Sequence, residues 1–118
     1  MTTAGWTIYY NPRCGTCRKV LDALKEKKIE PRIVEYLKNP PSAAEIDGVL
    51  KALKLEPKDI ARAKEDVYET LQLGTKTRSR AEWLKILSEN PILLQRPIVV
   101  GPGRAIVARP PEKVQELF

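Results

Sequence analysis

Two cysteines three positions apart are the residues of this chain whose types and spacing point most directly to chemistry. Cys14 and Cys17 follow an apolar run that ends at Tyr10, and a helical pattern begins between them at Gly15. A sulfur at the start of a helix faces free N–H groups and the positive end of the helix dipole, which favour a thiolate over a thiol. A thiolate at neutral pH is a nucleophile. We therefore expect Cys14 to be a reactive thiolate.

The residues available around Cys14 narrow the kinds of catalysis. Arg13 and Arg18 flank it and are expected to add positive charge. The chain has no histidine, which excludes Ser-His-Asp and Cys-His catalysis. A tetrahedral zinc site needs four ligands, which two cysteines do not supply, so no metal is expected. The Cys-x-x-Cys spacing then leaves a thiol-redox motif or a pair of structural thiols.

Other candidate residues lie at the ends of expected elements. Tyr10 and Asn11 immediately precede the cysteine loop, and they are expected either to serve strand-end packing and an ordinary turn or to support the loop, with Asn11 fixing it by hydrogen bonds to its backbone. Pro97 is expected to pack opposite that loop, with a cis bond after Arg96 as one form it can take. Arg62 and Arg109 are further cations, and for any one arginine a surface ion pair competes evenly with anion binding.

Composition favours an ordinary globular protein of one domain. The chain has 118 residues, of which 42% are hydrophobic and 31% charged, and its net charge is +6. Most lysines and arginines alternate with acidic residues, so a small anionic substrate is favoured over direct nucleic-acid binding. No run of about 20 apolar residues occurs, and no secretory pattern opens the chain. We expect a cytoplasmic protein that does not bind membranes.

The hydrophobic pattern predicts an α/β protein with the element order β-α-β, a helical insert, then β-β-α. The insert spans about 42–90, with capping-box spacing at Ser42 and at Ser79. One domain is expected over residues 1–118, and its strands and outer helices are expected at 6–10 (strand), 15–30 (helix), 32–37 (strand), 98–100 (strand), 105–108 (strand) and 112–117 (helix).

Four segments together carry a resemblance to a known family. They are Ile8-Tyr9-Tyr10-Asn11-Pro12-Arg13-Cys14, Lys64-Glu65-Asp66-Val67-Tyr68 just after Arg62, Pro91-Ile92-Leu93-Leu94-Gln95-Arg96-Pro97-Ile98-Val99-Val100, and Ala108-Arg109-Pro110-Pro111-Glu112-Lys113-Val114. In this order, over nearly the whole chain, the sequence resembles the glutaredoxin-coupled arsenate reductases, the ArsC-like family. The resemblance implies a thioredoxin-like fold with a four-stranded mixed sheet.

The resemblance also implies roles for individual residues. Cys14 matches the family's nucleophile, and Asn11 matches a loop asparagine. The three arginines that surround the oxyanion match Arg62, Arg96 and Arg109. The implied activity is the reduction of arsenate to arsenite, with glutathione as co-substrate, glutaredoxin as reductant and no bound cofactor.

Two departures from the family pattern leave alternatives open. Tyr10 stands where family members often have histidine. Cys17 stands where glutathione-dependent members often have serine, so that it is a candidate resolving thiol and thioredoxin a candidate donor. Spx-type regulators, which bind RNA polymerase, share the fold and the Cys-x-x-Cys loop, and a general thiol oxidoreductase is a third reading. Arg109-Pro110 favours the reductase.

Overall fold

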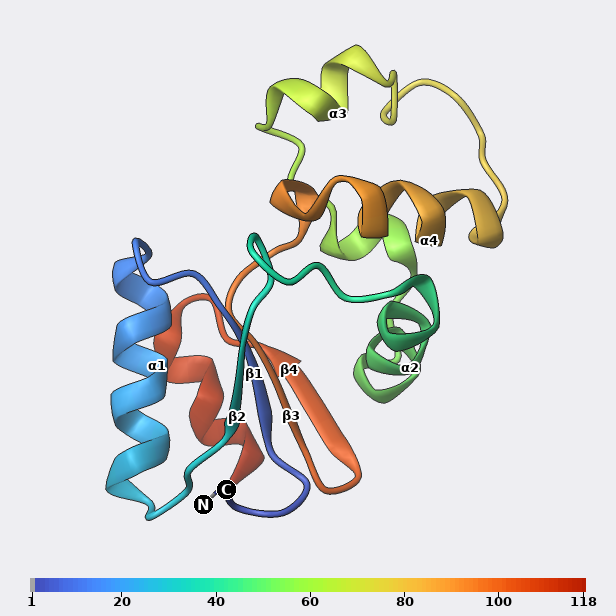
Figure 1. Ribbon diagram of the computed structural model, residues 1–118. Coiled ribbons are helices and arrows are strands. Elements are labelled where there is room, and N and C mark those ends of the chain that lie inside the picture. Colours follow the sequence, from blue (N-terminus) through green and yellow to red (C-terminus); the bar gives the residue numbers. More distant parts are fainter. Residues whose placement is uncertain (1) are drawn as a thin grey trace. The chain divides into compact units, whose positions relative to one another are not determined.

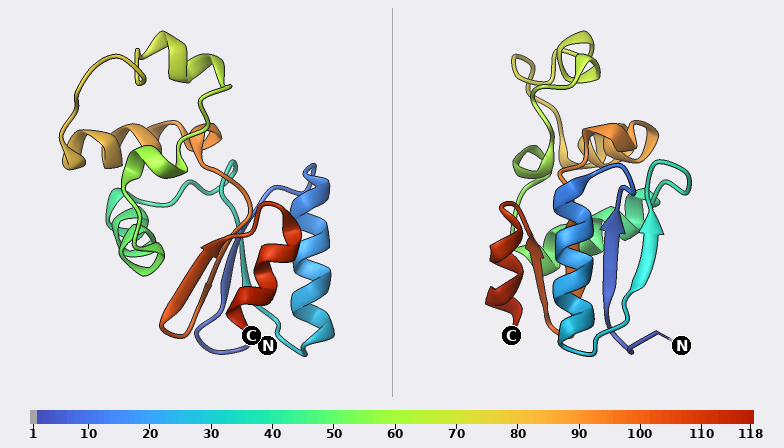
Figure 2. Two further views of the ribbon diagram at one scale, coloured as in Figure 1. Left: turned by 180° about the vertical axis from the view of Figure 1, so that it is seen from behind. Right: turned by 90° about the vertical axis from the view of Figure 1, so that its left-hand side faces the viewer.

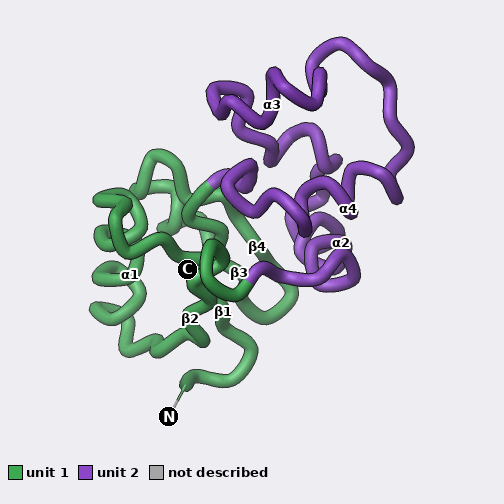
Figure 3. Tube along the Cα trace, turned by 45° about the horizontal axis from the view of Figure 1, so that its top comes forward, with its two compact units in different colours: residues 1–39, 96–118 green, residues 40–95 purple. Residues whose placement is uncertain are grey.

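The computed structural model describes residues 2–118, which form two compact units (Figure 3). Unit 1 contains the described residues up to Asn39 together with Arg96–Phe118, and unit 2 is Pro40–Gln95. The helical insert expected at about 42–90 falls within unit 2. Within residues 2–118, no helix is long and apolar enough to cross a bilayer.

Unit 1 is built on a four-stranded mixed sheet (Figure 1). Its strand order is β2-β1-β3-β4, in which β1 runs parallel to β2 and antiparallel to β3, and β3 runs antiparallel to β4. This is the sheet expected of a thioredoxin-like fold, which is confirmed. The strands are β1 (Thr7–Tyr10), β2 (Arg32–Glu35), β3 (Ile98–Gly101) and β4 (Arg104–Val107).

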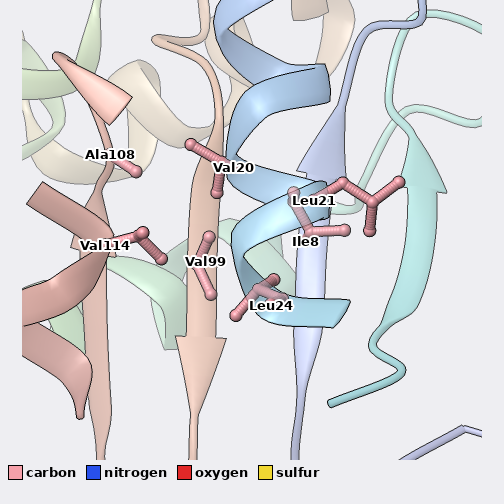
Figure 4. Packing of buried hydrophobic residues seen from close by; sticks show 7 residues of the cluster. All are labelled: Ile8, Val20, Leu21, Leu24, Val99, Ala108 and Val114. Atoms are coloured by element: carbon pink, nitrogen blue, oxygen red, sulfur yellow. The ribbon is translucent and has the colours of Figure 1, made fainter. Parts of the chain in front are cut away.

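Two helices, α1 (Gly15–Glu26) and η3 (Pro111–Leu117), cover one face of this sheet (Figures 1 and 2). The spacing of the apolar residues of α1 turns one stripe towards the strands, and η3, expected only as a short helix, is a 3₁₀ helix. Figure 4 shows the resulting core, in which these side chains meet: Ile8, Val20, Leu21, Leu24, Val99, Ala108 and Val114.

Unit 2 consists of short helical segments. Its two longer helices, α2 and α4, pack against each other, and a 2.7 Å ion pair joins Asp47 of α2 to Arg80 of α4. Both expected N-caps are present, because the side chains of Ser42 and Ser79 each accept a hydrogen bond from the backbone three residues on. The segments are α2 (Ala43–Leu53), η1 (Pro57–Ile60), α3 (Asp66–Thr70), α4 (Arg80–Glu89) and η2 (Pro91–Leu93).

One helix of the insert is shorter than expected. The sequence predicts that the helix beginning at Pro57 continues to about Lys64, whereas η1 is a 3₁₀ helix that ends at Ile60. The chain instead becomes extended at Ala61, which forms an isolated antiparallel bridge with Leu94. A long-range backbone pairing therefore ends the helix, and no residue near Ile60 signals it.

Candidate active site

The candidate site lies at the edge of the unit 1 sheet where β1 and β2 end and β3 begins. Tyr10 is paired with Glu35 at the ends of the two parallel strands, and Ile98 at the start of β3 is paired with Tyr9. The segments that follow β1 and β2 and the segment that precedes β3 therefore leave the sheet at one edge. Cys14 and Arg96 belong to two of these segments.

Cys14 is the N-cap residue of α1, in extended conformation, and its side chain is half-buried. Burial by itself would raise the pKa of this thiol. Hydrogen bonds from the backbone and side chain of Cys17, from Arg96 and from the backbone of Thr16 outweigh burial and lower the pKa of Cys14 to about 7. A substantial fraction of Cys14 is then thiolate at neutral pH.

The arginine that lies against the Cys14 sulfur is neither of its two flanking arginines. Arg13 and Arg18 flank Cys14 in the sequence, but both are exposed, and the arginine that bonds to the sulfur is Arg96. The helix start and its N–H groups contribute as expected.

Cys17 lies in the first turn of α1 and is fully buried in the apolar stripe of that helix. Burial, together with the neighbouring Cys14 sulfur, raises the pKa of Cys17 to about 12. It therefore remains a thiol at neutral pH and can donate its proton to the Cys14 sulfur. Both cysteines are free thiols.

Asn11 organises the loop that leads to Cys14. Its Oδ1 accepts a hydrogen bond of 3.0 Å from the backbone N–H of Arg13, and its carbonyl oxygen accepts one of 2.9 Å from the backbone N–H of Cys14. Asn11 is also buried, at 9% exposure. Asn11 therefore forms a turn and also fixes the loop, because the hydrogen bond that defines this Asx turn is the one that holds the loop backbone.

Arg96 approaches the loop from the residue before β3, and the bond from Arg96 to Pro97 is cis. Burial would lower the pKa of this half-buried guanidinium, but the nearby Tyr36 hydroxyl and Cys14 sulfur raise its pKa instead. Its buried Nε has no hydrogen-bond partner. Within residues 2–118 no carboxylate is paired with Arg96. A guanidinium without a carboxylate partner is able to bind an anion that enters the site, such as an anionic substrate.

Arg109 reaches the same segment from the end of β4. Its Nη1 donates a hydrogen bond of 3.4 Å to the backbone carbonyl of Arg96, and its side chain is exposed. The bond from Arg109 to Pro110 is also cis, which the sequence did not indicate. Unit 1 therefore brings together Cys14, Arg96 and Arg109.

Arg62 belongs to unit 2 and is described there alone. Its Nε donates a 3.1 Å hydrogen bond to Glu65, and its side chain is 17% exposed. Its backbone N–H donates to the carbonyl oxygen of Leu93 at 2.7 Å. Unlike Arg96, Arg62 forms an ion pair with a carboxylate, that of Glu65.

Comparison with known proteins decides the family. The ArsC family model matches residues 9–117, nearly the whole chain. The chain belongs to the ArsC family. An arsenate reductase of Rhizobium meliloti is 43% identical over 95% of this chain and 80% of its own length. The uncharacterized Escherichia coli protein YfgD is 41% identical over 93% of both chains. The solved structure of an arsenate reductase from Vibrio cholerae, 36% identical, superposes with a TM-score of 0.91 over 98% of this chain and 100% of its own.

Tyr10, where the sequence departs from the usual ArsC pattern, has a packing role here. Its side chain is half-buried against the core cluster beneath α1. Burial and the nearby Cys17 raise the pKa of Tyr10, so it is uncharged at neutral pH. It therefore brings no charge to the Cys14 loop of this ArsC protein.

Tyr36 is a residue of this ArsC site that sequence reasoning missed. We expected it to be the second-to-last residue of a strand ending at 37, but β2 ends at Glu35 and Tyr36 is fully buried beside Arg96. The signal that was available is its position: it follows the strand that runs parallel to the one leading to Cys14.

Proposed function

We propose that this protein reduces arsenate to arsenite, with the Cys14 thiolate as nucleophile. One observation carries the proposal: a thiol with a pKa of about 7 lies beside a half-buried arginine that no described carboxylate neutralises. Such a pair combines a nucleophile with a binding group for the oxyanion that it attacks. Relatives named as arsenate reductases, at 43% identity and below, support the choice of substrate.

In the first step, Cys14 attacks the pentavalent arsenic. A sulfur–arsenic bond forms, one arsenic–oxygen bond breaks, and the departing oxygen leaves as water after taking up protons from the substrate and solvent. Arsenic remains pentavalent. The guanidinium of Arg96 donates paired hydrogen bonds to the remaining oxygens and stabilises the charge that develops on them.

In the second step, a thiol attacks the Cys14 sulfur of the adduct. A disulfide forms, the sulfur–arsenic bond breaks, and its electron pair stays on arsenic, which becomes trivalent and leaves as arsenite. The two electrons come from the two sulfurs. We propose that glutathione supplies the second thiol and that glutaredoxin then removes it from Cys14. A location in the cytoplasm, where thiols are kept reduced, suits this chemistry.

Two further arginines are proposed to bind the oxyanion, and the support for each is different. Arg109 is bonded to the backbone of Arg96, which favours a shared role in holding the oxyanion. Arg62 is proposed as the third guanidinium on the family resemblance alone. Replacing Arg62 by Gln should raise the KM for arsenate if this assignment is right, and an unchanged KM would remove Arg62 from the site.

The test is an arsenate-dependent assay of disulfide formation with two donor systems, glutathione plus glutaredoxin, or thioredoxin with its reductase. We expect turnover with the first, its abolition by Cys14→Ser, and a loss of roughly 10²-fold in kcat/KM with Arg96→Lys, since lysine lacks the paired geometry.

Arg104→Lys is the matched control, because Arg104 is an exposed arginine of β4 whose Nη1 donates a hydrogen bond to the backbone carbonyl of Glu116. It should leave kcat/KM unchanged. Turnover that proceeds only with thioredoxin and its reductase would show that thioredoxin, and not glutathione with glutaredoxin, is the electron donor. Absence of turnover with either system, in a protein whose Cys14 is alkylated normally, would exclude arsenate as substrate.

A further inference from the structure

Arg13 and Arg18 are two cations beside Cys14 that the candidate site leaves unused. Both side chains are exposed, and neither forms a hydrogen bond or an ion pair with another residue of the described part of the chain. The first turn of α1, which begins at Gly15, contains no acidic residue. The solvent side of Cys14 therefore carries positive charge that the protein itself does not pair.

The guanidinium of Arg18 lies over the start of α1. The backbone N–H of Arg18 donates to the carbonyl oxygen of Cys14 at 3.2 Å, one turn back, and helical side chains lean towards the N-terminus. Its Nη2 accordingly lies 3.9 Å from the point that a Cβ atom on Gly15 would occupy. Gly15 is exposed and follows Cys14 directly, so this charge lies beside the cysteine on its solvent side.

Lys38 brings a third cation to the same edge of the sheet. β1 and β2 are parallel and end together at the pair Tyr10–Glu35, so residues 11–14 and 36–39 follow neighbouring strands (Figures 1 and 2). A hydrogen bond of 2.9 Å from the backbone N–H of Lys38 to the carbonyl oxygen of Glu35 closes the turn after β2. Within residues 2–118, the exposed side chain of Lys38 forms no ion pair.

Two carboxylates lie near these three cations without pairing with them. Asp22 is one turn further along α1 than Arg18, whose guanidinium extends in the opposite direction, towards the helix start. Glu35 is the last residue of β2 and is half-buried. Among the described residues, neither carboxylate forms an ion pair with any of the three cations. The exposed cations are thus free to bind an anion from solvent.

These exposed cations suit a different task from that of the half-buried Arg96. The second step of the proposed reaction needs a thiol that reaches Cys14 from solvent. Glutathione carries two carboxylates and one ammonium group at neutral pH and is therefore an anion. Guanidinium and ammonium groups bind carboxylates, and exposed positive charge speeds the encounter with an anion. An anionic thiol is therefore the ligand that this charge favours.

We propose that Arg13, Arg18 and Lys38 form a docking site for the carboxylates of an anionic thiol, glutathione, whose sulfur then reaches Cys14. The site selects glutathione over neutral thiols at the second step of the reaction. The proposal rests on the proposed function for the identity of the second thiol, but not on arsenate being the substrate.

The test follows thiol–disulfide exchange at Cys14 in the absence of arsenate. Full-length Cys17→Ser, in which Cys14 is the only thiol, is treated with methyl methanethiosulfonate to form the methyl disulfide of Cys14. An attacking thiolate forms a disulfide with one sulfur, the original sulfur–sulfur bond breaks, and the other sulfur leaves as a thiolate that takes up a proton. Mass spectrometry gives the rate constants with glutathione and with neutral β-mercaptoethanol. Their ratio cancels effects on Cys14 itself, which are common to both thiols.

Replacing Arg13, Arg18 and Lys38 together by Gln should lower the ratio of the glutathione rate to the β-mercaptoethanol rate by roughly 10-fold. The reason is that an exposed ion pair contributes a factor of roughly 2 to 5, which is also the fall expected for each single change. An unchanged ratio in the triple variant would overturn the proposal.

The matched control removes three exposed cations from the other end of the same unit, with Lys25→Gln, Lys28→Gln and Arg104→Gln combined. Lys25 and Lys28 lie at and just beyond the last turn of α1, and Arg104 begins β4 at the edge of the sheet where β1 starts. This variant should keep the ratio of the unchanged chain. A fall as large as in the docking variant would show that net charge alone sets the ratio, which would also overturn the proposal.

The two proposals fail separately. A lowered ratio in a protein that does not reduce arsenate would support the docking site and remove the proposed function. An unchanged ratio in a protein that does reduce arsenate with glutathione would remove the docking site alone.

Discussion

The reactivity of Cys14 arises from neighbours of two kinds, which differ in how far the sequence reveals them. The helix start, the backbone N–H groups and the Asn11 turn are local, so spacing along the chain predicts them. The interactions of Arg96 with Cys14 and with Tyr36 join residues far apart in the chain. These contacts depend on strand register, which the residues around Cys14 do not encode.

The pKa of Cys14 leads to a prediction about pH. Alkylation of Cys14 should be slow at acidic pH, rise with a midpoint near the pKa of about 7, and level off above it, because only the thiolate reacts. Arg96→Gln removes a hydrogen bond and a charge that favour the thiolate. It should move the midpoint upward, towards the ~8.5 of a free thiol. The measurement is the rate of iodoacetamide labelling of Cys14 against pH, read by mass spectrometry of the labelled peptide.

Arg104→Gln serves as the control, since it removes a positive charge from the same unit at a site bonded to Glu116 instead of Cys14. Its midpoint should match that of the unchanged protein. Equal upward shifts in both variants would mean that net charge, and not the Arg96 hydrogen bond, sets the reactivity of Cys14.

At the scale of elements, periodicity predicts which segments are helices and strands better than it predicts where they end. The apolar stripe of α1 and the serine N-caps of α2 and α4 were visible in the sequence and are present. The ends of β2 and η1 were not. Tyr36 and Leu37 continue the apolar character of β2, but pairing with β1 stops at Glu35. Element ends depend on partners that lie elsewhere in the chain.

The stripe of α1 supports a prediction about stability. Leu24 is fully buried in the core between α1, the sheet and η3, so Leu24→Ala leaves a cavity and should lower the free energy of unfolding by about 2–5 kcal/mol. Leu37, in the same unit, is 44% exposed, and Leu37→Ala should cost much less. Urea denaturation followed by tryptophan fluorescence measures both. A similar loss in the two variants would show that α1 does not pack on the sheet through this stripe.

At the scale of the whole molecule, the family and the order of elements were predictable because motifs are spread over nearly the entire chain. The match to the ArsC family over residues 9–117 and the four-stranded mixed sheet confirm both. The net charge of +6 fits an anionic substrate but does not choose one. The remaining question is whether the second thiol of the reaction comes from glutathione or from Cys17.

The burial of Cys17 leads to a prediction about the route of electrons. With its pKa raised to about 12, the Cys17 thiol is a poor nucleophile, and it is instead a hydrogen-bond donor to Cys14. Cys17→Ser keeps a donor at this position, so turnover with glutathione and glutaredoxin should be largely retained. Cys17→Ala removes the donor and should raise the alkylation midpoint of Cys14 above that of Cys17→Ser.

The competing route makes Cys17 the attacking thiol, and a single turnover with arsenate in the absence of glutathione distinguishes the two. If Cys17 attacks, the protein loses the mass of two hydrogen atoms, the loss maps to a Cys14–Cys17 disulfide, and Cys17→Ser is inactive with glutathione. We expect instead that the unchanged protein and Cys17→Ser hold arsenic on Cys14 equally until glutathione is added. The raised pKa of Cys17 favours this outcome, because its thiol stays protonated at neutral pH and only a thiolate attacks efficiently.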